Sequence, residues 1–163
     1  MPDETLLTLA QRGELKQPQV LRAQVERMLR DPKANAFTEN FTGQWLSLRE
    51  INATTPDKAL YPEFEEMLQW SAVRETQLCF DEILKENLSV RNFVDSDFTM
   101  LNGRLAKHYG IPDVHGVAFR KVQLQPEYHR GGILTHASVL KVTANGTTTS
   151  PVIRGVWVLD RIL

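Results

Sequence analysis

The 163-residue sequence lacks several features that would point to a particular class of protein. It contains a single cysteine, Cys79, so no internal disulfide can form, and it has no C-x-x-C-H string to attach a c-type haem. No run approaches the eighteen consecutive apolar residues of a transmembrane helix. The residues from Met1 to Glu4 show no charged-then-apolar export signal. The sequence therefore predicts neither a disulfide-stapled scaffold nor a membrane span.

An excess of charge of one sign is also absent. The chain has 19 Lys and Arg against 20 Asp and Glu, a net charge of -1, and no basic field of the kind that nucleic acids or anionic membranes attract. Hydrophobic residues at 42% and charged residues at 24% are ordinary for globular proteins, which argues against disorder. We expect a packed core and no nucleic-acid partner.

The common catalytic and metal-binding motifs are missing. No H-E-x-x-H, EF-hand loop, Walker loop or G-x-S-x-G string occurs. The four histidines form two pairs with seven-residue spacing, His108 with His115 and His129 with His136. Seven helical residues span about 10.5 Å, too far to share one ion, although loops could bring the rings together. We therefore predict no metal site.

Apolar residues recur at three- and four-residue spacing through most of the chain, which predicts helices. The expected helices cover residues 3–13, 17–31, 34–48, 63–86, 99–109, 133–142 and 150–163. Only residues 117–124 alternate with the period of two that is typical of a strand. The sequence predicts a mainly α protein, an irregular bundle of five to seven helices with at most a small β element at residues 117–124.

The longest expected helix carries apolar residues on more than one face, which predicts a central helix contacted from several sides. Glu75 lies on its apolar stripe, and a carboxylate there must find a partner or have a raised pKa. We expect Glu75 to be buried and paired with Arg130 or Arg154. The alternatives are a functional acid or a water-exposed edge of the helix. Trp45, Trp70 and Trp157 also lie on apolar stripes and are expected in the core.

Two polar segments are candidate surface sites, residues 129–132 and 145–150. Their glycines permit close approach of another group. Ser150 and the free N–H groups behind it could hold an anion at a helix start, with charge-assisted hydrogen bonds from Arg130 and Arg154. The competing interpretation is that these segments are tight turns and a capped helix in a domain interface.

Several strings resemble a known pair of protein families. The first set is Arg27-Met-Leu-Arg-Asp31, Phe41-x-x-x-Trp45-Leu46 and Arg74-Glu75-Thr76. The second set is Leu101-Asn102-x-x-Leu105-Ala106-x-x-Tyr109-Gly110, Arg130-Gly-Gly-Ile-Leu134 and Thr149-Ser150-Pro151-x-x-Arg154-Gly155-x-Trp157. Together they resemble the adjacent domains of unknown function 1592 and 1588 of planctomycete-type bacteria. Residues 1–112 resemble the first, and residues 113–163 resemble the start of the second, packed as one unit with it.

This resemblance implies a cellular location and a neighbouring domain, and it does not imply a reaction. In that family the domains sit in large exported proteins, commonly beside a c-type cytochrome domain, so an extracytoplasmic location is expected. A c-type haem is expected elsewhere in the parent protein, and no cofactor in this chain. The family's chains continue past the last helix into a proline-rich stretch, so we expect a segment truncated at its C-terminus. The resemblance supplies no catalytic residues.

Two functions are open at this point. The first is a non-catalytic structural or interaction module that packs against a haem domain or another part of the parent protein, so that the chain by itself is not an enzyme. The second is a ligand-binding or catalytic domain that acts on a small molecule or sugar together with that haem domain, using Glu75, Arg130 and His136. A polar cleft that gathers these three residues would favour the second function. A closed surface with Glu75 ion-paired in the core would favour the first.

Overall fold

The computed structural model describes residues 2–163, which form two compact units divided after Phe37. The first unit contains α1 (Glu4–Gln11) and α2 (Pro18–Leu29). Asp3 caps α1 by accepting the backbone N–H of Leu6, and its carboxylate pairs with Arg27 of α2 at 2.7 Å. Neither helix has a fully buried residue, and apolar side chains such as Leu6, Leu9 and Leu29 are only half-buried.

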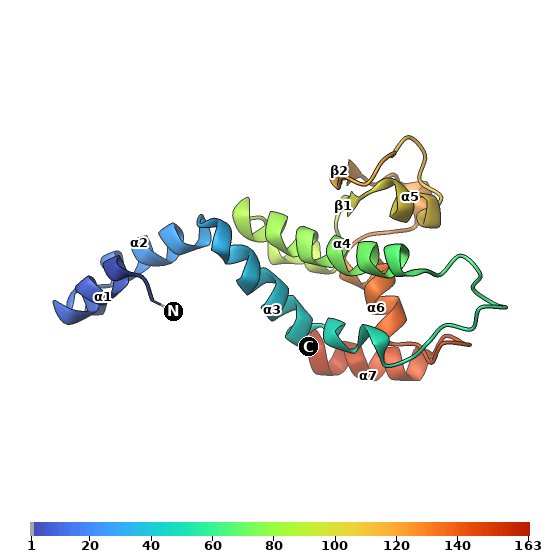
Figure 1. The fold of residues 1–163 in the computed structure, drawn as a ribbon, viewed down its shortest axis with the longest axis horizontal. Coiled ribbons are helices and arrows are strands. Elements are labelled where there is room, and N and C mark those ends of the chain that lie inside the picture. The colour runs from blue at the N-terminus through green and yellow to red at the C-terminus, as the bar shows by residue number, and fades with distance from the viewer. Residues whose placement is uncertain (1) are drawn as a thin grey trace. The chain divides into compact units, whose positions relative to one another are not determined.

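The second unit contains the remaining helices and the only strands among residues 2–163. Its elements are α3 (Asn35–Trp45), which starts just before the unit boundary, α4 (Glu66–Lys85), β1 (Phe98–Leu101), α5 (Gly103–Tyr109), β2 (Arg120–Gln123), α6 (Ala137–Val142) and α7 (Pro151–Arg161). The strand β1 and the helices α5 and α6 pack around α4, which is central as its apolar faces predict, and β2 pairs with β1 (Figure 1).

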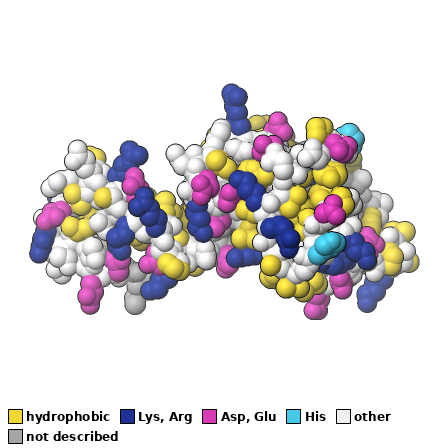
Figure 2. Space-filling model, turned by 90° about the horizontal axis from the view of Figure 1, so that it is seen from above, with side chains coloured by type: hydrophobic (Ala, Val, Ile, Leu, Met, Phe, Trp, Pro, Cys, Tyr) yellow, Lys and Arg dark blue, Asp and Glu magenta, His cyan; other side chains and the backbone are white. Residues whose placement is uncertain are grey.

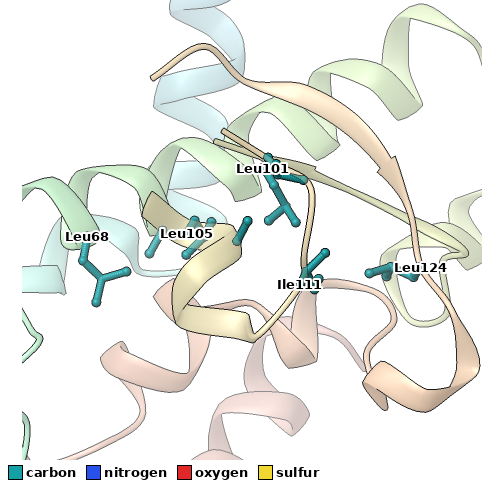
Figure 3. Packing of buried hydrophobic residues seen from close by; sticks show 8 residues of the cluster. Leu68, Leu101, Leu105, Ile111 and Leu124 are labelled. Carbon is teal, nitrogen blue, oxygen red and sulfur yellow. The ribbon is translucent and has the colours of Figure 1, made fainter. Parts of the chain in front are cut away.

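Two clusters of buried side chains stabilise this unit. The first lies between α4, β1, α5 and the segments on either side of β2, and contains Leu68, Leu101, Leu105, Ile111 and Leu124 (Figure 3). The second joins the end of α3, α6 and α7, and contains Leu46, Leu48, Ile133, Val139 and Trp157. None of the helices among residues 2–163 is both long enough and apolar enough to cross a bilayer.

The predicted fold class is confirmed, with one correction. The small β element at residues 117–124 is β2, but its antiparallel partner β1 lies where the sequence predicted the start of a helix at residue 99. The helix begins only after Asn102, whose side chain accepts the N–H of Leu105 at 3.0 Å. Pairing of Thr99 with Val122, which are far apart in the sequence, overrides the local helical spacing. Likewise, α6 begins at Ala137, after a 3₁₀ turn, and not at residue 133.

The three tryptophans differ in burial. Trp157 is buried as predicted, and Trp45 is half-buried with its Nε1 donating to the carbonyl of Arg161 at 2.6 Å. The prediction for Trp70 is wrong, because its side chain is 52% exposed and its ring meets the edge of the Phe119 ring. Figure 2 shows hydrophobic side chains among charged ones on the surface of the second unit. Trp70 is therefore one of several exposed apolar side chains.

Gly132 and Gly155 give a matched test of this packing. Gly132 has φ +66° and a Cβ there would lie 2.4 Å from the carbonyl oxygen of Val94, whereas a Cβ on Gly155 would meet no atom within 4 Å. We expect Gly132→Ala to lower the free energy of unfolding by about 1–3 kcal/mol. Gly155→Ala, inside α7, should raise it by about 0.5–1 kcal/mol. Urea denaturation measures both, and similar effects at the two positions would contradict the close approach at Gly132.

Candidate functional site

Glu75 is the centre of a buried hydrogen-bonded cluster. Its side chain, on α4, is 1% exposed. Thr99 of β1 donates its hydroxyl to Oε1 at 2.6 Å, and Tyr109 at the end of α5 donates to Oε2 at 2.5 Å. The Tyr109 oxygen in turn accepts the backbone N–H of Ala137 at 2.8 Å. One carboxylate therefore connects α4, β1, α5 and α6.

His136 completes this cluster as a neutral ring. Its Nδ1 lies 2.9 Å from the hydroxyl of Thr76, which also contacts the Ser138 hydroxyl at 2.7 Å. Its Nε2 lies 3.9 Å from Oε1 of Glu75. Burial, with a smaller effect of the Arg130 charge, lowers the pKa of His136 to about 3. The imidazole is therefore uncharged at neutral pH, and its contact with Glu75 is not an ion pair.

Burial dominates the acid–base properties of the cluster. It raises the pKa of Glu75 to about 7, although hydrogen bonds from Thr99 and Tyr109 and the charge of Arg130 act in the opposite direction. Burial also raises the pKa of Tyr109, so this hydroxyl remains protonated and donates to the carboxylate. Cys79, one turn further along α4, lies 3.6 Å from the Thr99 hydroxyl, and burial raises its pKa to about 12.

The predicted burial of Glu75 is confirmed, but the predicted ion pair with an arginine is wrong. Arg130 lies over the ring of Tyr109, 3.5 Å from its centroid, and donates to the carbonyl of Thr135 at 2.7 Å. Arg154 donates instead to the hydroxyls of Thr143 and Thr149. Within residues 2–163, hydroxyl groups from β1 and from the end of α5 take the place of the expected guanidinium.

A cavity of about 320 Å³ lies beside this cluster. Its wall is mainly apolar and includes Ile51, Phe64, Leu68, Ala72 and Leu140. Tyr109 also lines the cavity and connects it to Glu75, whereas Glu75 and His136 do not line it. Of the proposed catalytic residues, the structure places all three close together but leaves only Arg130 in contact with the open space.

Of the three proposed anion-binding residues, too, only some line the cavity. Arg130 and Arg154 line the cavity, and Ser150 does not. The Ser150 hydroxyl caps α7 by accepting the N–H of Ile153 at 3.4 Å. In the loop before it, Asn145 accepts the N–H groups of Thr147 and Thr148. Ser150 thus fits the capped-helix interpretation, while the two arginines fit a binding role.

Sequence reasoning missed Thr99, Tyr109 and Lys141. Lys141, on α6, lines the cavity and donates to the carbonyls of Ile51 and Thr54. The one signal for Tyr109 is its place in the Leu101–Gly110 string on which the resemblance rests. No group of three or more His, Cys, Asp or Glu side chains that could hold a metal ion occurs within the described chain.

The geometry defines a helical module in which the polar cluster around Glu75 joins α4, β1 and α5 to α6. The chain belongs to the family described as PSD4, protein of unknown function (DUF1592), whose model matches residues 1–111. Residues 130–163 match the model described as PSCyt3, protein of unknown function (DUF1588). These adjacent matches confirm the resemblance seen in the sequence. No curated protein and no solved structure matches the chain.

The two matched regions meet at the candidate site. Glu75, Thr99 and Tyr109 lie in the first region, and Arg130 and His136 lie in the second. The cavity wall likewise draws residues from both regions. The site is therefore a property of the two regions together and belongs to neither alone.

Proposed function

We propose that this chain is a non-catalytic interaction module of a larger exported protein, and that α7 carries its docking surface. The supporting observation is that α7 is apolar on two opposite faces. Trp157 is buried in the second core cluster, while Val152, Val156 and Leu159 on the other side are 78%, 52% and 63% exposed. Their four- and three-residue spacing places them on one stripe, and an exposed apolar stripe of this kind is normally covered by another element or chain.

The partner in this proposal is a c-type cytochrome domain of the same parent protein, in an extracytoplasmic compartment. The name PSCyt3 of the matching family model supports the cytochrome association. The haem would be held by that other domain, since this chain has no attachment string. A contiguous exposed apolar stripe is the kind of surface that such an association buries.

Leu159 and Leu60 provide a matched test, because both leucines are exposed to a similar degree, 63% and 59%, and Leu60 lies outside α7. We expect Leu159→Glu to weaken association with the separately produced cytochrome domain at least about tenfold, because a carboxylate would be desolvated in the interface. Leu60→Glu should leave the affinity unchanged. Titration calorimetry measures both. Absence of association, or equal loss in both variants, would contradict the proposal.

Binding of a small molecule in the cavity is a second candidate function. It is favoured by a cavity of about 320 Å³ whose wall is mainly apolar and carries a few polar groups, as ligand sites usually do. A reaction there has less support. Glu75 and His136 do not line the cavity, and the only member of their cluster that both lines it and bonds the carboxylate is Tyr109. The cluster therefore reaches the cavity through Tyr109, while its carboxylate and imidazole do not touch the contents.

A further inference from the structure

Three cationic side chains line the cavity without a carboxylate partner. Arg130, Lys141 and Arg154 are half-buried, and their hydrogen bonds go to the neutral oxygens of Thr135, of Ile51 and Thr54, and of Thr143 and Thr149, respectively. Several bases elsewhere in the second unit do have a carboxylate partner. Arg74 contacts Glu39, Arg104 contacts Glu65 and Lys121 contacts Glu82. The other bases of this unit that have no acid partner, such as Arg91, are exposed, so among the described residues the cavity gathers the half-buried bases that lack an acid.

The charge on the cavity wall is correspondingly positive. Glu63 is the one carboxylate in the wall, and its side chain is exposed to solvent. His108 adds no further positive charge at neutral pH, since burial lowers the pKa of this imidazole. Burial also lowers the pKa of Lys141, the direction expected of an ammonium group without a counter-charge. A negatively charged group in the cavity would relieve this imbalance.

The rest of the wall selects against a bare inorganic ion. Phe64, Leu68, Ala72 and Leu140 offer apolar surface that an ion such as phosphate would leave in contact with water. A volume of about 320 Å³ is at the small end of ligand sites, which fits one ring with a short side chain. The wall therefore suits a compact molecule that is apolar at one end and anionic at the other.

We propose that the cavity binds a small organic carboxylate with an aromatic body, an inference that rests on the ligand-binding function proposed above. Arg130 uses one of its five guanidinium N–H donors and Arg154 uses two in bonds within residues 2–163. The remaining donors suit a planar carboxylate, which guanidinium groups bind in pairs of hydrogen bonds. The apolar wall takes the ring.

A matched set of probes tests the inference. The chain is titrated with 3-phenylpropanoate, with 3-phenylpropanamide, which has the same shape without the charge, and with inorganic phosphate. NMR chemical-shift changes report binding. We expect the carboxylate to bind at least about tenfold more tightly than the amide, and phosphate to give no saturable shifts at the same concentration, because the probes separate the charge from the apolar body.

Variants then assign the charge recognition. Arg154→Met and Arg130→Met keep apolar volume but remove the guanidinium, and each should weaken carboxylate binding at least about tenfold while leaving amide binding unchanged. Arg91→Met, at an exposed arginine away from the cavity, should change neither. Circular dichroism checks that each variant is folded, and Arg154→Met, which spares the stacking on Tyr109, keeps the test valid if Arg130→Met unfolds.

Each failure has a separate meaning. Equal affinity for carboxylate and amide would overturn the anion preference while leaving the cavity as a ligand site. Binding of neither ring compound would overturn the ligand-binding function itself. Phosphate that competes as well as the carboxylate would overturn the requirement for an apolar body.

Discussion

Glu75→Gln is expected to change the pH dependence of stability by about 3 kcal/mol between pH 4 and pH 8. In the wild-type protein burial raises the pKa of Glu75 from 4.5 to about 7, so between these values the folded state holds a proton that the unfolded state has released. The resulting contribution to stability is fully present below about pH 4.5 and is lost as the pH rises to about 7. Glutamine does not titrate, so the variant lacks this loss.

His136 changes the stability with pH in the opposite direction to Glu75, which makes the effect of Glu75→Gln easier to detect. Its pKa is lowered from 6.5 to about 3, so the stability that it contributes is present above about pH 6.5 and is lost as the pH falls. The two groups offset each other between about pH 4.5 and 6.5 in the wild type. In Glu75→Gln the effect of His136 is uncompensated, and the variant should lose stability on acidification through this range.

Urea denaturation at a series of pH values from 4 to 8 measures the free energy of unfolding of the wild type and of Glu75→Gln. The contributions of the other titrating groups cancel in the difference between the two. The control is Glu86→Gln, at an exposed position just after α4, which should keep the wild-type profile. Glu82 is a poorer control, because its carboxylate is 2.8 Å from Lys121. Parallel profiles for wild type and Glu75→Gln would mean that the carboxylate is not buried as described.

Trp157→Ala is expected to lower the free energy of unfolding by about 3–5 kcal/mol. Trp157 is the one fully buried residue of α7 and joins this helix to the cluster around Leu46 and Val139. Removing the indole therefore creates a cavity and releases α7 from the core. Trp70→Ala, at a position 52% exposed, should cost less than about 1 kcal/mol.

A second substitution at the same position separates packing from hydrogen bonding. Among residues 2–163 the buried Nε1 of Trp157 has no hydrogen-bond partner. Trp157→Phe removes this unsatisfied donor together with part of the volume, so the two effects partly cancel and the change should stay within about 1.5 kcal/mol. Chemical denaturation monitored by circular dichroism gives all three values. If Trp157→Ala were as mild as Trp70→Ala, the assignment of α7 to the core would be wrong.

The features that the sequence predicted are those set by neighbouring residues. Three- and four-residue spacing located most of the helices, and the alternation near Val122 located β2. The strand β1 was missed because its stabilising partner lies about twenty residues further along, which local spacing cannot register. Trp70 was misplaced for a related reason, since a helix that is apolar on several faces does not reveal which face the fold leaves uncovered.

In the candidate site, too, the sequence predicted what depends on neighbouring residues and missed what depends on distant ones. The position of Glu75 on an apolar stripe predicted its burial, because that depends on its own helix alone. Its partners could not be predicted, since Thr99 and Tyr109 reach it only through the folding of β1 and α5 against α4. Lys141 sits in an apolar run and attracts no notice in the sequence, yet the segment that contains Ile51 and Thr54 brings its ammonium group to the cavity.

The reactivity of Cys79 can report how often the buried cluster opens. It is the only thiol in the chain, it is 4% exposed, and its sulfur lies against Thr99 with a pKa of about 12. A thiol reagent attacks only an accessible thiolate, which the closed structure does not offer. Modification therefore requires α4 to separate from β1, and its rate measures how often this core opens, without an engineered label.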